Sequence, residues 1–314
     1  MCPRSFALFL FFLTPPSAAR LKGADPTARP CQSHHHSSTW ASQMSENEVE
    51  LSSPPTDGVS ALAFCPHGRL LAATSWDSQI HLYRVNSADL VTSLPQPSPL
   101  LDCAFLDGGK IVSGATDGAL RLHDFESDIE RVLGRHANGV RCVGKCAAVG
   151  AVVTGSWDRS IKIWDARTSE ACIGTYAQPD KVFAMCAGVL GANSPSIPLL
   201  VVATASRHVR ILDLRKPSDP LQIRESALKC QTRAVAQMTN NIGYAMGSVE
   251  GRVAVEYFDA DPNVQKKRYA FKCHRTPVGG EPTQRALQCH QAHDAHCVGL
   301  RQFSCLRTFA LPIN

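Results

Sequence analysis

The chain has 314 residues, of which 44% are apolar and 19% are charged, so it can bury a sizeable core and carries too little charge for a mostly disordered chain. Its 20 prolines and 21 glycines suit many short strands better than long helices, and a net charge of +5 is too small to indicate nucleic acid binding by itself. The longest apolar run, residues 6–13, is far shorter than the roughly 18 residues that a membrane-spanning helix needs, so none is predicted.

The first 43 residues differ in composition from the rest. Arg4, the apolar run 6–13 and small residues ending near Ala19 resemble a secretory signal peptide. Three consecutive histidines, at 34–36, lie in a low-complexity stretch without partner ligands, so no metal site is predicted there. The 13 cysteines form no CxxC pair, which favours reduced thiols inside the cell. We therefore expect residues 1–43 to be a disordered extension that does not direct secretion, with a secreted interaction protein as the alternative.

Five similar units follow, roughly between residues 57 and 260. Each unit has an acidic or polar turn residue, two spacers and then a strand with period-two alternation, preceded by further short apolar runs. Such a unit of about four strands cannot bury its own faces, whereas units stacked radially can. The sequence therefore predicts an all-β propeller over residues 44–272. The turn residues, 40, 41, 48 and 44 residues apart, are Asp77, Asp117, Asp158, Ser206 and Glu250.

The third unit, GSWDRSIKIWD, resembles the WD-repeat propellers. In that family a His, a Ser or Thr, the turn Asp and a strand Trp form a hydrogen-bonded chain. The resemblance assigns these roles to His136, either Thr154 or Ser156, Asp158 and Trp164.

The other units depart from this pattern, because Tyr83, His123 and Leu212 stand where the Trp would be. We interpret the turn acids Asp77 and Asp117, like that of the third unit, as stabilising turns rather than as catalytic groups. The chain also contains no GxSxG, HExxH or phosphate-binding loop, so no enzyme activity and no cofactor are predicted.

Residues 273–314 are predicted to be a divergent tail. The family usually closes its ring with seven blades, and no sixth repeat is visible after Arg275, so the pattern indicates five recognisable blades of a probable seven-bladed ring. The tail clusters cysteine and histidine residues in an arrangement that matches no zinc-binding pattern, so no metal is predicted. That cluster consists of Cys289, His290, His293, His296 and Cys297.

From about Glu46 to Arg275 the chain resembles the mitotic spindle-checkpoint propellers of the budding-uninhibited-by-benzimidazoles group. The segments that carry the resemblance include GRHANGVRCV, ESALKCQTRAV and SVEGRVAVEYFDADPNVQKKRYAFKCHR. The related nuclear-pore mRNA-export propellers share the EGRVA and FKCHR elements, so an export adaptor is the alternative function.

The resemblance implies a binding module of the nucleus, kinetochore and cytoplasm. Its partners would be checkpoint kinases, held through a short linear motif, and a kinetochore scaffold read at phosphorylated Met-Glu-Leu-Thr repeats. A ubiquitin-ligase-associated checkpoint complex is a further implied partner, and neither direct DNA binding nor membrane binding is expected.

The same resemblance assigns the binding residues. The kinase motif would contact Trp76, Trp157, Lys266 and Lys267, and the phosphopeptide would contact Lys229, Arg233 and Arg252. Charge supports the second assignment, because residues 207–275 contain 13 Lys and Arg against 7 Asp and Glu. Arginine guanidinium groups can bind phosphate with two hydrogen bonds each.

Overall fold

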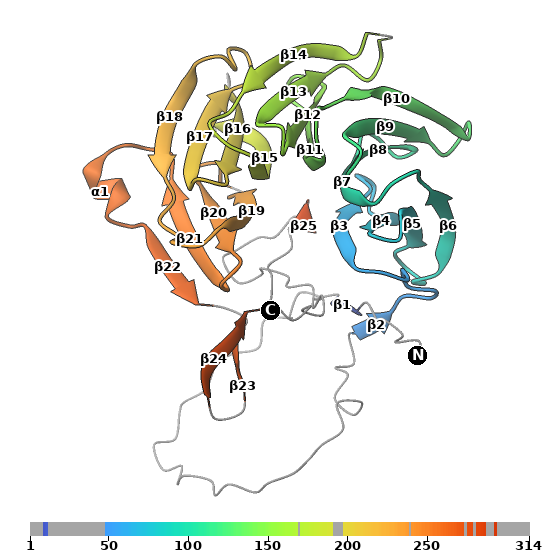
Figure 1. Ribbon diagram of the computed structural model, residues 1–314, viewed down its shortest axis with the longest axis horizontal. Coiled ribbons are helices and arrows are strands. Elements are labelled where there is room, and N and C mark those ends of the chain that lie inside the picture. The colour runs from blue at the N-terminus through green and yellow to red at the C-terminus, as the bar shows by residue number, and fades with distance from the viewer. Residues whose placement is uncertain are drawn as a thin grey trace, which may run out of the picture.

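The computed structural model describes residues 9–11, 48–168, 170–190, 197–238, 240–272, 275–278, 281–286 and 292–293. Within them, regular structure is almost entirely β, with one four-residue helix, α1 (Pro262–Gln265). Twenty of the strands form five consecutive four-stranded antiparallel units, called blades 1 to 5 (Figure 1). The predicted all-β propeller with five recognisable blades is confirmed.

The strands of each blade follow one another along the chain. Blade 1 contains β3 (Val59–Phe64), β4 (Leu70–Ser75), β5 (Gln79–Arg84) and β6 (Leu90–Pro95). Blade 2 contains β7 (Leu100–Phe105), β8 (Lys110–Ala115), β9 (Ala119–Asp124) and β10 (Ile129–Arg135). Blade 3 contains β11 (Val140–Cys146), β12 (Ala151–Ser156), β13 (Ser160–Trp164) and β14 (Cys172–Ala177). Blade 4 contains β15 (Val182–Leu190), β16 (Ile197–Thr204), β17 (His208–Asp213) and β18 (Pro220–Glu225). Blade 5 contains β19 (Thr232–Gln237), β20 (Gly243–Ser248), β21 (Arg252–Tyr257) and β22 (Tyr269–Lys272).

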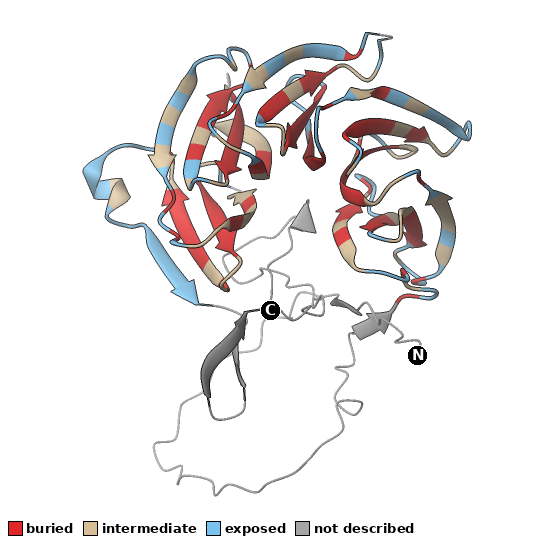
Figure 2. Ribbon diagram, in the orientation of Figure 1, coloured by how far each residue is buried: buried red, intermediate tan, exposed pale blue. Residues whose placement is uncertain are grey.

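The blades fan out around a common axis, with the first strand of each blade innermost and the fourth outermost (Figure 1). The inner strands contact one another in series, from β3 through β7, β11 and β15 to β19. The second and third strands of each blade are mostly buried, whereas the fourth strand is mostly half-buried or exposed (Figure 2).

The hydrophobic core lies between neighbouring blades. One cluster joins Ala72 and Ile80 of blade 1 to Cys103 and Ile111 of blade 2. Similar clusters link the later blades. Each unit therefore buries its faces against the next unit, which is the physical reason that the repeats fold together rather than singly.

Because the strands of a blade alternate in direction, its connections lie at two ends. The turns between second and third strands share one end, here called the top face, with the connections between blades. Backbone hydrogen bonds join these connections, for example from Gln96 N–H to the Ser78 carbonyl at 2.7 Å and from His136 N–H to the Gly118 carbonyl at 2.8 Å. The opposite end, the lower face, carries the other two connections of each blade, which are likewise joined, as from Phe258 N–H to the Ile242 carbonyl at 3.0 Å.

The ends of the chain differ in part from expectation. Within the predicted disordered extension, β1 (Phe9–Phe11) forms antiparallel pairs with β2 (Glu48–Glu50), because its apolar residues favour a strand and find a partner there. In the predicted divergent tail, β23 (Arg275–Val278) pairs with β24 (Glu281–Ala286), and β25 (Ala292–His293) lies parallel to β3. These strands do not make a sixth four-stranded blade among the described residues.

The histidines 34–36 and most of the Cys/His cluster of the tail lie outside the described residues. Among those that are described, no group of three or more His, Cys, Asp or Glu side chains is arranged to hold a metal ion. No helix in the described part of the chain is long and apolar enough to cross a membrane.

Candidate functional site

The turns of the top face share one backbone geometry. The residue after each acidic or polar turn residue has a positive φ of 64° to 80°. Only two of these five residues are glycine, although a side chain disfavours this conformation. The hydrogen bonds of each turn, rather than the conformational preference of this residue, therefore stabilise the positive φ. The five residues are Ser78, Gly118, Arg159, Arg207 and Gly251.

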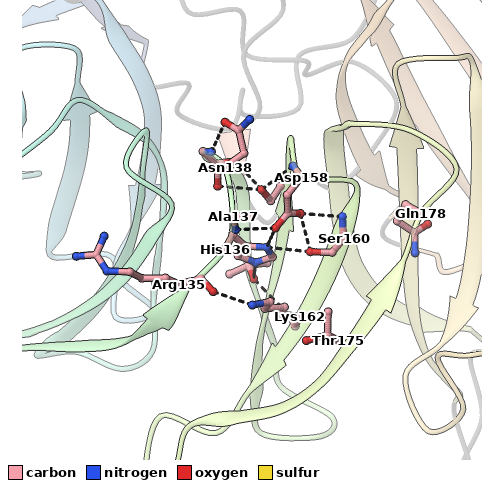
Figure 3. Close-up of polar contacts among 12 residues, drawn as sticks. Arg135, His136, Ala137, Asn138, Asp158, Ser160, Lys162, Thr175 and Gln178 are labelled. Carbon is pink, nitrogen blue, oxygen red and sulfur yellow. Dashed lines mark hydrogen bonds and ion pairs between the residues drawn. The ribbon is translucent and has the colours of Figure 1, made fainter.

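In blade 3 a chain of hydrogen bonds joins the turn residue Asp158 to the buried Trp164, and Figure 3 shows the Asp158–His136 end of it. The Trp164 indole N–H donates to Thr154 Oγ1 at 2.7 Å, Thr154 Oγ1 lies 2.7 Å from His136 Nε2, and His136 Nδ1 lies 2.9 Å from Asp158 Oδ2. A neutral histidine protonated at Nδ1 satisfies every group in this chain. Burial, opposed in part by Asp158, lowers the pKa of His136 and so favours that neutral form. Thr154 rather than Ser156 takes part, because the Ser156 hydroxyl donates to backbone carbonyls.

In blades 1 and 2 the turn acid has hydrogen-bond partners that differ from those in blade 3. In blade 1, His81 Nε2 lies 3.0 Å from Asp77 Oδ2. In blade 2, Asp117 accepts from Arg121 at 2.6 Å and pairs with Arg135 at 3.3 Å. Burial opposes ionisation of Asp117, but the bonds from Arg121 and the backbone outweigh it and lower its pKa to about 2. The turn acids are thus held by hydrogen bonds and ion pairs within the fold.

One prediction concerns His123, which occupies in blade 2 the position that Trp164 occupies in blade 3. Burial is the main cause that lowers its pKa from 6.5 to about 4, with Arg121 adding to it and Glu130 opposing. Because this pKa is lower in the folded protein, the unfolded chain binds a proton at a higher pH than the folded protein does. The stability that comes from the neutral His123 is therefore fully present above pH 6.5 and is lost as the pH falls towards 4. The loss should reach about 3 kcal/mol in the free energy of unfolding.

Urea denaturation between about pH 7 and pH 5 tests the first part of this loss, about 2 kcal/mol, since the full loss is reached only near pH 4 and below. His123→Gln can retain a hydrogen bond to Ser113, whose Oγ lies 3.1 Å from His123 Nε2, but does not titrate. The variant should therefore lose less stability over this range than the wild type. An equal loss in both proteins would show that other groups cause the acid sensitivity.

The two tryptophans expected to bind a partner both lie at turns of the top face. Trp76 is 46% exposed and flanks Gly58. Trp157 is half-buried over Gly139, and its indole N–H is buried without a hydrogen-bond partner in the described part of the chain. The two rings therefore offer apolar surface on the same face, from blades 1 and 3.

A pair of arginines marks the start of two inner strands. In every blade the register between the first two strands shifts at the second residue of the inner strand, and this residue is Arg141 in blade 3 and Arg233 in blade 5. Burial and then repulsion from Arg141 lower the pKa of Arg233 to about 10. Both Nε groups are buried without a partner, and neither arginine forms an ion pair within the described residues. Two cations that repel each other at a partly buried site are costly to fold unless an anion compensates them.

The remaining predicted phosphate-binding residues lie nearby on the same face. Lys229 is exposed in the 226–231 connection that leads into β19. Arg252 begins β21, directly after the turn of blade 5, and its Nε lies 3.4 Å from Glu250 Oε1. In the described residues no hydrogen bond or ion pair joins these two side chains to Arg233. Lys229 is therefore exposed, whereas Arg252 and Arg233 are both half-buried.

The prediction that Lys266 and Lys267 join the two tryptophans is not supported by the topology. Both lysines follow α1 in the connection between β21 and β22, which belongs to the lower face. Because each strand reverses the chain direction, a connection after a third strand cannot reach the top face. These lysines therefore lie in a lower-face connection, whereas Trp76 and Trp157 lie at top-face turns.

Sequence reasoning missed three residues of the top face. Arg141 and Phe183 occupy the same position in β11 and β15 as Arg233 occupies in β19, so aligning the starts of the inner strands could have found them. Arg207 is one of the two spacers that follow the turn residue Ser206, so the repeat pattern by itself gives it no role. All three come from blades 3 and 4, where the top face is also basic. Other basic residues of the top face are Arg159 and Lys181, together with Arg135 at the end of blade 2.

These blades, with the Asp–His–Thr–Trp hydrogen-bonded chain of blade 3, define a WD40-repeat β-propeller. The family described as "WD domain, G-beta repeat" matches residues 47–84 and 128–165. Mitotic checkpoint protein BUB3.1 of Arabidopsis thaliana is 44% identical over 235 residues, which are 74% of this chain and 67% of that protein. Mitotic checkpoint protein bub3 of Dictyostelium discoideum is 38% identical over 240 residues, 76% of this chain and 71% of that protein. Poly(A)+ RNA export protein of Schizosaccharomyces pombe is 35% identical over 242 residues, 74% of this chain and 65% of that protein.

The chain belongs to the BUB3-type family of WD40-repeat proteins, to which the mRNA-export propellers are related.

Proposed function

We propose that this protein is a non-catalytic scaffold of the mitotic spindle checkpoint that binds phosphorylated Met-Glu-Leu-Thr repeats at unattached kinetochores and a short motif of checkpoint kinases. The top face binds both ligands, with Arg233 and Arg141 at the phosphate and with Lys229 and Arg252 at the rim. The supporting observation is that Arg141 is buried and Arg233 is half-buried, and that both Nε atoms lack a hydrogen-bond partner within the described residues, because a bound phosphate would supply negative charge there.

The proposal extends to location and partners. The protein would act in the nucleus, at kinetochores and in the cytoplasm, and would enter a ubiquitin-ligase-associated checkpoint complex without contacting DNA or membranes itself. The names of the related checkpoint proteins support this setting. The signal-like start of the chain would not direct secretion.

Titration of the full chain with labelled Met-Glu-Leu-Thr peptides tests the proposal. The phosphorylated peptide should bind at least about tenfold more tightly than the unphosphorylated one. Its affinity should fall with added salt, because salt screens the attraction between the phosphate and the basic side chains. Equal affinity for the two peptides would refute the phosphate site. Co-precipitation of a nuclear-pore component in place of a checkpoint kinase would favour the mRNA-export alternative, which the similarity to an RNA export protein supports.

A further prediction separates the two ligands. Trp76→Ala should weaken binding of the kinase motif, because an exposed aromatic side chain that becomes buried on binding is a common anchor. Phosphopeptide affinity should stay within about twofold of wild type, since removing Trp76 removes no charge. Isothermal titration with each peptide measures both. Ile173→Ala is the matched control, because Ile173 is 61% exposed but lies on the outer strand β14; a loss of motif binding in this control would argue against a specific anchor.

A further inference from the structure

The connection between blades 4 and 5 is longer than the others. Four residues join blades 1 and 2, four join blades 2 and 3, and four join blades 3 and 4 (residues 96–99, 136–139 and 178–181), whereas residues 226–231 make a connection of six. Leu228 within it is 1% exposed and packs in the core of blades 4 and 5, while the next residue, Lys229, is exposed. A longer connection has more conformational freedom, so fixing Lys229 in place requires additional contacts.

Arg207 supplies those contacts. Its Nε donates to the Leu228 carbonyl at 3.1 Å and its Nη2 to the Ser226 carbonyl at 2.9 Å. Its Nη1 lies 3.1 Å from Glu225 Oε1, and its own carbonyl accepts from Ser226 N–H at 2.8 Å. All three nitrogens of the guanidinium group are thus engaged within the fold. Although Arg207 lies on the basic top face, it is therefore poorly placed to donate to a ligand.

Arg159 provides the contrast within the same molecule. It has the same place in the turn of blade 3 and nearly the same φ, 66° against 65° for Arg207. It is exposed, and no side-chain hydrogen bond or ion pair of Arg159 is seen in the described part of the chain. Its neighbouring connection has only four residues. An arginine at this turn therefore does not by itself bind the neighbouring connection. Arg207 does so, and so clamps the 226–231 connection, because this longer connection presents two carbonyl groups.

We infer that Arg207 is a positioning residue for the phosphopeptide site: it clamps the 226–231 connection and so places Lys229 beside the start of the strand that carries Arg233. The inference rests on the proposed function, since it assigns Lys229 its place at that site. It also predicts which chemistry is needed at residue 207. Lysine keeps the charge but lacks the planar fork that reaches two carbonyl groups at once, so it should not replace arginine.

The experiment compares Arg207→Lys, Arg207→Ala and the matched control Arg159→Ala in the full chain. Hydrogen–deuterium exchange of peptides spanning 226–231 reports on the clamp without any ligand. Titration with the phosphorylated Met-Glu-Leu-Thr peptide reports on the site. Both Arg207 variants should exchange faster in 226–231, and should bind about five- to tenfold more weakly, the loss expected when one charged rim contact is no longer held in place. Arg159→Ala should change exchange in 226–231 little and binding less than threefold.

The outcomes separate the two proposals. If wild type does not prefer the phosphorylated peptide, the proposed function fails, while faster exchange in the Arg207 variants still supports the clamp. If Arg207→Lys exchanges and binds like wild type, charge alone suffices and the positioning role is overturned. An equal loss of binding in Arg159→Ala and Arg207→Ala would likewise overturn it, because the effect would then come from net charge on the top face.

Discussion

Replacing Arg233 by alanine should weaken binding of the phosphorylated Met-Glu-Leu-Thr peptide by about one to two orders of magnitude. A hydrogen bond to a charged group contributes roughly 1.5–3 kcal/mol, and 1.4 kcal/mol corresponds to a tenfold change in affinity. Arg233 is half-buried, so water replaces its contact with phosphate less well than at a fully exposed position. Arg252→Ala should cost less, because Arg252 is partly exposed and already lies near Glu250.

Fluorescence anisotropy with phosphorylated and unphosphorylated peptides measures these losses. Arg141→Ala and the double variant with Arg233→Ala complete a double-mutant cycle, and a coupling well above experimental error is expected if both arginines contact one phosphate. Arg159→Ala is the control for charge, since it removes one exposed cation from the same face. Unchanged phosphopeptide affinity in both the Arg141 and Arg233 variants would contradict the proposed site.

Replacing Trp164 by alanine should destabilise the protein by about 3–5 kcal/mol, the usual cost of truncating a buried Trp. The ring is 1% exposed, donates to Thr154 and lies edge-on to His136 with the ring centroids 6.0 Å apart. It also packs against Gly134 of blade 2, where a Cβ atom would lie 2.4 Å from the Trp164 ring. The variant thus loses packing within blade 3 and between blades 2 and 3. This is a large share of the roughly 5–15 kcal/mol that stabilises a typical domain.

Thermal and urea denaturation measure this loss, and Trp157→Ala is the matched control. Both variants remove one indole, but Trp157 is only half-buried at a top-face turn and its N–H has no partner in the described residues. The control should cost less than half as much. Equal losses would contradict the prediction that full burial and the hydrogen-bonded chain together make Trp164 the more stabilising residue.

The five blades could be predicted from sequence because their signals are local. Each repeat signal lies within about 45 residues of sequence. These signals are a turn acid such as Asp158, the strand with period-two alternation that follows it and the spacing to the next turn. The assignment of Trp76 and Trp157 to one face follows for the same reason, because both directly precede a turn acid. The lower-face position of Lys266 and Lys267 was also open to prediction, since counting strand reversals from the turn would have shown it.

The sequence by itself thus determined the fold class, the repeat boundaries and the positions of the turns. Only the tertiary structure decided which distant residues meet. Arg141 and Arg233 come close because blades 3 and 5 place equivalent strand starts around one axis, and nothing in either local segment encodes that approach. The clamp of Arg207 on Leu228 likewise depends on how a six-residue connection folds back onto a turn. Local patterns specify elements through backbone preference and burial, whereas a binding site depends on side-chain contacts between elements far apart in the chain.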